Sequence, residues 1–422
     1  MAKKSAGRGT ARRSSIAVPR KNAVATLRAS DRRGEPGSGL ILREREPLNL
    51  ESPQSALRES ITPSEQFYVR NHFAEPDLKR STWRLSVEGA VKKPGNFSYR
   101  ELTAMATQSQ VTVIECAGNG RVFLAPREEG VQWQSGAAGN AEFTGVPLTA
   151  LLERVGILST AVDVMFEGAD HGEIEDEPTS PGDIHFARSV PVATARAGDV
   201  LLAYKMNGTD LTRSHGFPVR VVVPGWYGMA SVKWLKRIVV TAKPFDGFFQ
   251  SLQYSRWERI NGAPTLIPVT ELQVKSIIVD PEMGSVIPAG ETFTVRGQAW
   301  TGVGTVARVE VSVDGGKKWA TARLTSPASQ HAWRSWAFAW RPTAGDHSVM
   351  VRATDSQGRT QPMDRDKDRR SYEINHVVPT AVVVRDRDWR VHCDESLSSR
   401  RDREPVRPAV SPKRRRSSSR SA

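Results

Sequence analysis

The sequence predicts an α+β domain followed by an immunoglobulin-like β-sandwich. Between Trp83 and about residue 242, short apolar strand patterns mix with a few helical ones. From Leu272 onward, every apolar segment has strand character. Regular short strands separated by Gly and Asp turns over roughly 100 residues are typical of such a sandwich. At 422 residues the chain is long enough for two to three domains with a sizeable core.

The first domain is expected to span residues 47–262. It begins with an extended lead-in to about residue 80 that prolines interrupt repeatedly. Residues 82–87 then alternate between polar and apolar side chains, which predicts a strand, whereas residues 148–155 have helical spacing. Residues 219–223 and 232–241 are further strand candidates.

The second domain is expected to span residues 268–383, after a boundary in the Pro- and Gly-containing stretch 261–268. Asp314-Gly315-Gly316 supplies a hairpin turn within it. Its strand candidates are VKSIIV (274–279), ETFTVRGQAW (291–300), VARVEVSV (306–313) and HSVMVRATD (347–355).

The net charge of +14 lies entirely in the two ends of the chain. Residues 1–46 carry +8 and residues 384–422 carry +6, so the body between them is neutral. The body is therefore not a basic nucleic-acid binder. Both ends are rich in Lys, Arg and Ser and are predicted to be disordered basic tails. They could contact nucleic acid, acidic lipid or an acidic protein, and a merely solubilising extension fits equally well.

The N-terminal region contains no apolar stretch typical of a secretory signal. Arg12-Arg13 resembles the start of a twin-arginine signal, but Pro19, Arg20 and Arg28 interrupt the residues C-terminal to it. No segment is long and apolar enough to cross a membrane, and two cysteines do not indicate a disulfide framework. These features predict a cytoplasmic protein.

The most informative motif is ECAGNGR, residues 115–121. Cys116 follows a β-branched run, residues 111–114, that reads as a buried strand. Gly118 and Gly120 allow a sharp turn and a close approach to a bulky ligand. A thiol at the end of a strand, with Arg121 nearby to favour the thiolate, is well placed to bind a metal. A buried core cysteine is the alternative interpretation.

Four segments resemble the sulfite oxidase family of molybdopterin-dependent oxidoreductases. They are VTVIECAGNGR (111–121), FYVRNH (67–72), the run at 203–238 that contains HGFPVR and KWLKR, and GQAWTGVGTVARVEVSVDGGKKW (297–319). The last resembles the family's C-terminal dimerisation domain. The resemblance implies a molybdopterin domain, a homodimer and a molybdenum-molybdopterin cofactor with one molybdenum per chain.

The resemblance also implies site residues. Cys116 is the expected sulfur ligand of molybdenum. Arg70, Asn71, His72, Asp170, His215, Arg220, Ser231 and Lys233 are the expected cofactor contacts. Without the motifs, a structural role would be the slightly favoured interpretation of His72 and His215. A buried arginine such as Arg220 needs a partner, and an anionic cofactor would provide one.

On the substrate side, the resemblance gives Arg121, Arg70 and Tyr254 catalytic positions. The arginines suit a small oxyanion, and the phenol can help proton movement. Trp133 is expected to line the pocket, while Gly120 replaces another arginine of the animal enzymes. Matching the family's WNxRG segment to Asn375 puts Val377 where a substrate arginine is expected, with His376 beside it. On that alignment we expect weaker anion binding.

The predicted activity is the oxidation of sulfite to sulfate, with electrons passing to a separate acceptor protein or to dioxygen. The sequence has no CxxCH motif and no b5-like domain, so no haem is expected. The alternatives are an oxidoreductase acting on another small oxo-substrate such as a sulfoxide, or a non-catalytic protein with a vestigial cofactor pocket.

Overall fold

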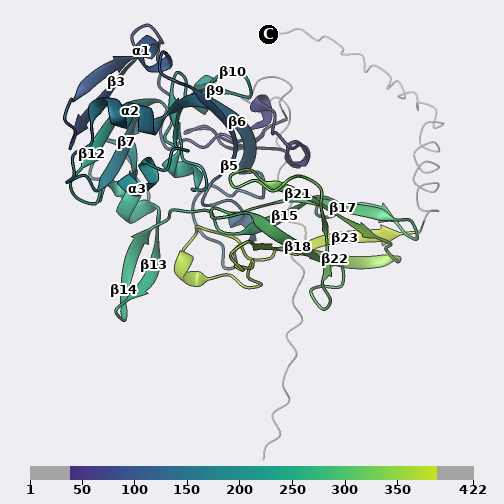
Figure 1. Ribbon diagram of the computed structural model, residues 1–422. Helices are drawn as coiled ribbons and strands as arrows, with labels where there is room; N and C mark the ends of the chain where they lie inside the picture. The colour runs from purple at the N-terminus through teal and green to yellow at the C-terminus, as the bar shows by residue number, and fades with distance from the viewer. Residues whose placement is uncertain (1–38, 387–422) are drawn as a thin grey trace, which may run out of the picture.

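The computed structural model describes residues 39–386, and the greater part of both basic tails lies outside this range. Two strand-rich domains lie side by side, and the hairpin of β13 (Ser255–Ile260) and β14 (Ala263–Pro268) projects from the first (Figure 1). The first domain mixes strands with three short helices and the second is built from strands, as the sequence predicts. Within residues 39–386, no helix is long and apolar enough to span a bilayer.

The first domain contains two five-stranded sheets. One has the order β10-β9-β6-β5, with β11 paired to β9, and the other has the order β4-β3-β12-β7-β8. The strands of the first sheet are β5 (Gln108–Glu115), β6 (Ala138–Pro147), β9 (Leu201–Met206), β10 (Thr209–Asp210) and β11 (Arg220–Val222). Those of the second are β3 (Arg84–Gly89), β4 (Gly95–Ser98), β7 (Asp163–Gly172), β8 (Ile184–Pro191) and β12 (Leu235–Thr241).

The periodicity of the sequence accounts for the local elements of this domain. In β3 the apolar side chains of Leu85 and Val87 are buried and alternate with more exposed neighbours. The helices are α1 (Tyr99–Thr103), α2 (Leu148–Val155) and α3 (Val192–Ala195). Helix α2 coincides with the predicted helix and buries Leu148, Leu151 and Val155 on one face. Its apolar stripe joins the main core.

The second domain is a sandwich of two sheets. The first sheet contains β15 (Lys275–Asp280), β17 (Phe293–Trp300), β20 (Arg323–Leu324) and β21 (Arg334–Trp340). The second contains β16 (Val286–Pro288), β18 (Val306–Ser312), β19 (Ala320–Thr321), β22 (Gly345–Asp355) and β23 (Thr380–Arg385). The predicted turn at Asp314-Gly315-Gly316 lies between β18 and β19, and both glycines have positive φ. The apolar faces of the two sheets form a core of their own.

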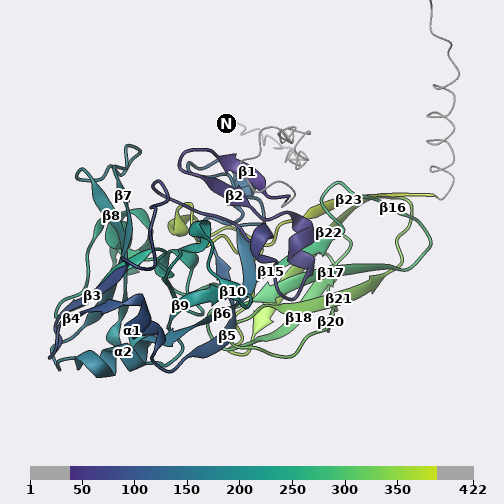
Figure 2. The ribbon, with the colours of Figure 1, turned by 90° about the horizontal axis from the view of Figure 1, so that it is seen from above.

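The N-terminal segment differs from the expectation. Residues 1–46 were expected to be disordered, but β1 (Ile41–Glu44) pairs with β2 (Asn49–Glu51), and Leu42 is buried. The next segment of the chain links the two domains (Figure 2). Gln54 Nε2 donates to the carbonyls of Ile278 and Val279 in the sandwich. Regular structure is therefore already present several residues before the boundary that the charge pattern suggests.

Candidate active site

The Cys116 loop begins where β5 ends. Cys116 accepts a hydrogen bond at its carbonyl from the Asn119 backbone, and its own N–H donates to Ala137 O, each at 2.9 Å. The preceding residue, Glu115, is buried and receives Lys275 Nζ at 2.7 Å and Trp300 Nε1 at 2.8 Å. Both donors come from the sandwich domain. The loop that carries the thiol is therefore held from both domains.

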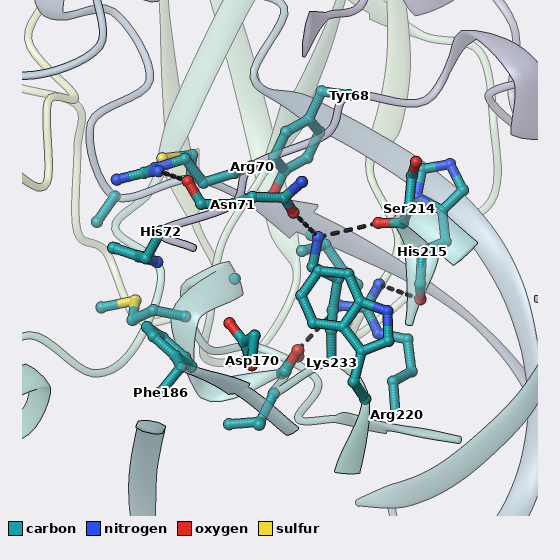
Figure 3. A pocket seen from close by; sticks show the side chains of 18 of the residues that line it. Tyr68, Arg70, Asn71, His72, Asp170, Phe186, Ser214, His215, Arg220 and Lys233 are labelled. Atoms are coloured by element: carbon teal, nitrogen blue, oxygen red, sulfur yellow. Dashed lines mark hydrogen bonds between the residues drawn. The ribbon is translucent and has the colours of Figure 1, made fainter. Parts of the chain in front are cut away.

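Cys116 lines a cavity with about 670 Å³ of empty space, a volume that includes open solvent at its mouth. The cavity brings together ten of the eleven predicted site residues, which come from separate segments of the first domain (Figure 3). They are Arg70, Asn71, His72, Cys116, Asp170, His215, Arg220, Ser231, Lys233 and Tyr254.

Positive charge dominates the buried wall of this cavity. Lys233 Nζ donates to Asn71 Oδ1 and, at 2.9 Å, to Ser214 O (Figure 3). Arg220 donates to the carbonyls of Ser231 at 2.9 Å and His215 at 3.3 Å. Within residues 39–386, neither cation has a carboxylate within ion-pair distance. Burial lowers the pKa of both groups.

Asp170 is the one acid on this wall within the described range, and it does not neutralise the cations. Its Oδ1 atom is buried without a hydrogen-bond partner in the described part of the chain. Burial raises its pKa, although the charge of Lys233 partly opposes this effect. A buried site with surplus cations and an unpaired acceptor fits a ligand that combines an anionic group with hydrogen-bond donors. A pterin with a phosphate has both features.

The two cavity histidines are neutral near neutral pH. The pKa of His215 is lowered to about 3 by burial, with Lys233 and Arg220 adding to the effect. Its Nε2 atom donates to Ser64 O at 3.1 Å, which fixes the proton on that nitrogen. Burial, together with the charges of Arg70 and Lys233, also lowers the pKa of His72 well below its usual range.

Tyr254 is held at the opposite side of the cavity. Its hydroxyl lies 2.8 Å from His72 Nε2. The His72 ring stacks on Phe186 with centroids 4.7 Å apart and contacts Phe249 edge-on at 4.9 Å. Burial raises the pKa of Tyr254, so its hydroxyl keeps its proton.

Arg188 is an arginine that the sequence analysis missed. It is completely buried, and its guanidinium donates to Phe249 O at 2.5 Å and Val269 O at 2.7 Å. Phe249 opens the π-helix Phe249–Gln253 that ends directly before Tyr254, and the Val269 N–H bonds to Tyr254 O at 2.9 Å. Arg188 therefore fixes both ends of the segment that carries Tyr254. The sequence around Arg188 shows the same pattern as a solvent-facing residue of a half-buried strand, so it gave no sign that Arg188 is buried.

Arg121 is the predicted site residue that does not line the cavity. Its guanidinium lies against Gly118 and Gly130, where a side chain at either glycine would collide with it. It donates to Val131 O at 2.8 Å and to Ser371 O at 3.2 Å. Trp133 does not line the cavity either. It is fully buried one layer behind, with its ring edge-on to Tyr68 at 6.4 Å.

Val377 occupies the position where the sequence comparison expects a substrate arginine. Val377 is buried and donates its N–H to Pro362 O. It lines neither this cavity nor a second cavity, whose lining includes Glu51, Lys275 and Gln361. His376 lines this second cavity, and burial lowers its pKa. The residues that approach Tyr254 from this segment are Arg370 and Tyr372. Arg370 Nη1 donates to Leu252 O at 2.9 Å and to Ser255 Oγ at 2.8 Å, on both sides of Tyr254.

The alignment on Asn375 alone concealed these two residues. The paired Arg369-Arg370, followed by an aromatic residue at 372, was the signal available in the sequence. The charges of Arg121, Arg370 and Arg70 all lower the pKa of Tyr372 against the larger effect of burial. The charges of these three arginines therefore all act on one phenol, and the Arg121 guanidinium carbon lies 5.7 Å from the centre of its ring.

Comparison with known proteins agrees with this geometry. The family described as "Oxidoreductase molybdopterin binding domain" matches residues 72–249, and the "Mo-co oxidoreductase dimerisation domain" matches residues 267–375. The chain is 36% identical to chicken sulfite oxidase over 345 residues, which cover 77% of this chain and 73% of that protein. The chain is also 36% identical to human mitochondrial sulfite oxidase. That match covers 76% of this chain but only 61% of the human protein. Sulfite oxidase of Arabidopsis thaliana is 33% identical over 76% of this chain and 88% of that protein.

Among solved structures, the sulfane dehydrogenase SoxCD of Paracoccus pantotrophus superposes with a TM-score of 0.67. It is 29% identical over 79% of this chain and 83% of that chain. The sequence motifs, the two-domain fold and the curated relatives therefore agree. The chain belongs to the sulfite oxidase family of molybdopterin-dependent oxidoreductases, and it carries the family's dimerisation domain.

Proposed function

We propose that this protein oxidises sulfite to sulfate at a molybdenum centre whose protein ligand is the Cys116 thiolate. The observation that carries the proposal is the position of three arginines. Arg70 lines the cavity together with Cys116 and Tyr254, the Arg121 guanidinium lies 5.7 Å from the Tyr372 ring, and Arg370 donates hydrogen bonds on both sides of Tyr254. Guanidinium groups suit a small oxyanion such as sulfite because each presents several donors in one plane. The whole reaction converts sulfite and water into sulfate, two protons and two electrons.

The cofactor would lie along the cationic wall of the cavity. Lys233 and Arg220 would bind its phosphate, because each is buried and points its charge at the cavity without a carboxylate partner among the described residues. His215, with its proton fixed on Nε2, would present its other ring nitrogen as an acceptor. Asp170 would accept hydrogen bonds from the pterin at its unpaired Oδ1 atom.

When bound, the molybdenum-molybdopterin group supplies the oxygen that is transferred to sulfur and takes up the two electrons. The protein's own residues bind and orient the substrate. Arg70, Arg121 and Arg370 supply positive potential that draws the anion toward the thiolate side of the cavity. Tyr254 keeps its hydroxyl proton, and its hydroxyl oxygen lies 2.8 Å from Nε2 of the neutral His72. The hydroxyl could share that proton with the reacting oxygen.

Arg370 revises the expected affinity. The sequence analysis predicts weak sulfite binding because Val377 cannot carry a charge. With Arg370 anchored beside Tyr254, the third cation comes from elsewhere in the same segment. We therefore expect sulfite binding of ordinary strength for the family, without the pH dependence that His376 would have introduced.

The family's dimerisation domain supports a homodimer as the functional form. The electrons would leave to a separate acceptor protein or to dioxygen. The cytoplasmic location stays a prediction, and nucleic-acid binding is proposed only through the basic tails, most of whose residues lie outside the described range.

A second candidate is the oxidation of a sulfane sulfur. Its support is the structural likeness to a sulfane dehydrogenase and the glycine at position 120, which leaves the Cys116 loop less charged than in the animal enzymes. A sulfoxide is the remaining small oxo-substrate to test.

The test combines metal analysis with steady-state kinetics of the full chain. We expect close to one molybdenum per chain, and dye reduction that depends on sulfite. A persulfide and a sulfoxide serve as competing substrates in the same assay. Full molybdenum occupancy with no turnover of sulfite, but turnover of the persulfide, would replace the first proposal with the second.

A further inference from the structure

A short segment of the second domain, residues 370–374, is attached directly to the Cys116 loop. Glu373 N–H donates to Ala117 O at 2.9 Å, and Arg121 Nη2 donates to Ser371 O at 3.2 Å. The residue between these two attachments is Tyr372. Its backbone is therefore fixed beside the loop that carries the thiol.

The Tyr372 ring packs between two groups of the proposed reaction site. Its centroid lies 5.0 Å from that of Tyr254, with the planes tilted by 43°. The guanidinium carbon of Arg121 lies 5.7 Å from the same ring, within the range of a cation–π contact. A phenylalanine could make both contacts equally well, so packing does not account for the hydroxyl.

The Tyr372 hydroxyl has no hydrogen-bond partner among residues 39–386, whereas the Tyr254 hydroxyl pairs with His72. The charged groups whose fields reach the Tyr372 phenol are Arg121, Arg370 and Arg70, together with Cys116. Arginine has only donors and cannot accept the phenol's proton. Tyr372 is only half-buried, and its hydroxyl is not one of the buried unpartnered polar atoms of residues 39–386, so it is open to solvent and can donate to a bound ligand. Burial of the ring raises the pKa of Tyr372, so the hydroxyl keeps that proton.

We infer that Tyr372 is a substrate-binding residue, whose hydroxyl donates a hydrogen bond to an oxygen of the oxyanion that the three arginines attract. The inference rests on the proposed function of this site and adds a residue from the second domain. A tetrahedral oxyanion has enough oxygens to satisfy the phenol and the guanidinium groups together. Sulfite and its product sulfate share this chemistry, so both should bind through Tyr372.

The test is Tyr372→Phe, which keeps the ring and removes only the hydroxyl. The KM for sulfite should rise roughly 10-fold or more, since a hydrogen bond to a charged group is worth about 10- to 150-fold in affinity. The kcat should change much less, because the contact is present before and during the reaction. Calorimetric titration of the resting, molybdenum-loaded protein with sulfate should give the same loss of affinity without any turnover.

The matched control is Tyr204→Phe. Tyr204 packs edge-on to Tyr99 at 6.2 Å and, among residues 39–386, has no ring contact with Tyr254 or Arg121 such as Tyr372 makes, so both constants and the sulfate affinity should stay at wild-type values. Molybdenum content and the unfolding midpoint of both variants should match the wild type, which shows that the fold and the cofactor are retained.

The outcomes separate the inference from the proposed function. Normal sulfite turnover with unchanged KM and sulfate affinity in Tyr372→Phe would overturn the inference alone. Sulfate binding that weakens in Tyr372→Phe, in a protein that does not oxidise sulfite, would support the inference and refute the function. Failure of the wild type to bind either anion would overturn both.

Discussion

Lys275→Met should destabilise the protein by about 3 kcal/mol, because it removes the cation from a buried ion pair. Lys275 Nζ lies 2.7 Å from Glu115 Oε1, and the two side chains are only 8% and 1% exposed. Methionine matches the length of the lysine side chain and keeps its packing. The remaining effect is an uncompensated charge on Glu115, directly before Cys116 in the chain.

The magnitude depends on the hydrogen bonds that Glu115 keeps. Removing one partner of a buried pair typically costs about 3–5 kcal/mol. Glu115 still receives Trp300 Nε1 at 2.8 Å and Asn119 Nδ2 at 3.1 Å, which places the expected loss at the lower end of that range. The Asn119 carbonyl also loses its 3.0 Å contact with Lys275. Because Asn119 belongs to the Cys116 loop, the molybdenum content of the purified variant should fall as well.

Urea unfolding followed by tryptophan fluorescence measures the loss of unfolding free energy, and metal analysis measures the molybdenum content of the variant. Lys236→Met is the matched control, since Lys236 pairs with Glu167 at 3.4 Å but is 36% exposed. An exposed pair contributes at most about 1 kcal/mol. In the double variant Glu115→Gln/Lys275→Met, residue 115 no longer carries a charge and can keep its hydrogen bond to Trp300. The loss of unfolding free energy in the double variant should therefore be smaller than the sum of the losses in the two single variants. A loss under about 1 kcal/mol for Lys275→Met, or strict additivity, would refute the reasoning.

Three further predictions concern the site itself. Cys116→Ser should abolish sulfite oxidation and lower molybdenum content while the unfolding midpoint stays nearly unchanged, because a hydroxyl does not ionise readily to replace a thiolate; full turnover would disprove the ligand assignment. Arg370→Ala should raise the KM for sulfite at least about 10-fold in steady-state kinetics, whereas Val377→Arg should not lower it. An unchanged KM in Arg370→Ala together with a lowered KM in Val377→Arg would support Val377 as the substrate-arginine position instead. The pKa of His215 is about 6.5 in the unfolded chain and about 3 in the folded chain, so between these values only the unfolded chain binds the proton. Acidification from about pH 6.5 to about 3 should therefore lower the free energy of unfolding of the cofactor-free protein by about 1.4 kcal/mol per pH unit. His215→Gln should flatten that dependence in urea titrations, and an unchanged slope would mean that His215 is not responsible.

Contiguous motifs made much of the site predictable. Cys116, the Arg70–His72 segment and the residues from His215 to Lys233 each lie inside a motif whose spacing fixes its position relative to a strand end. The structure brings them to one cavity, as expected. The periodicity of β3 and α2 likewise predicted their buried faces, since one side of each element packs on the core.

The residues whose positions the sequence did not predict share a physical cause: their surroundings depend on distant parts of the chain. Arg370 and Tyr372 lie in an irregular stretch between β22 and β23, where no periodicity fixes the register and a single asparagine was a poor guide. Arg188 lies on a strand, where its burial depends on carbonyls 61 to 81 residues away that no local pattern reveals. Trp133 is an aromatic residue near the Cys116 motif and was therefore expected to line the pocket. The Tyr68 ring packs against it and lies between it and the cavity.

The second domain has a role within one chain that its dimerisation label does not convey. Lys275 and Trp300 hold Glu115 on one side of Cys116, while Glu373 binds the backbone of Ala117 on the other. In the first domain alone, Glu115 would be left with Asn119 as its only described partner, and its buried carboxylate would have to be solvated or protonated. The loop would then be free to rearrange at the position where the thiol must meet the metal. The geometry of the thiolate, and with it the proposed activity, therefore depends on the interface between the two domains as much as on the molybdopterin domain that contains the motif.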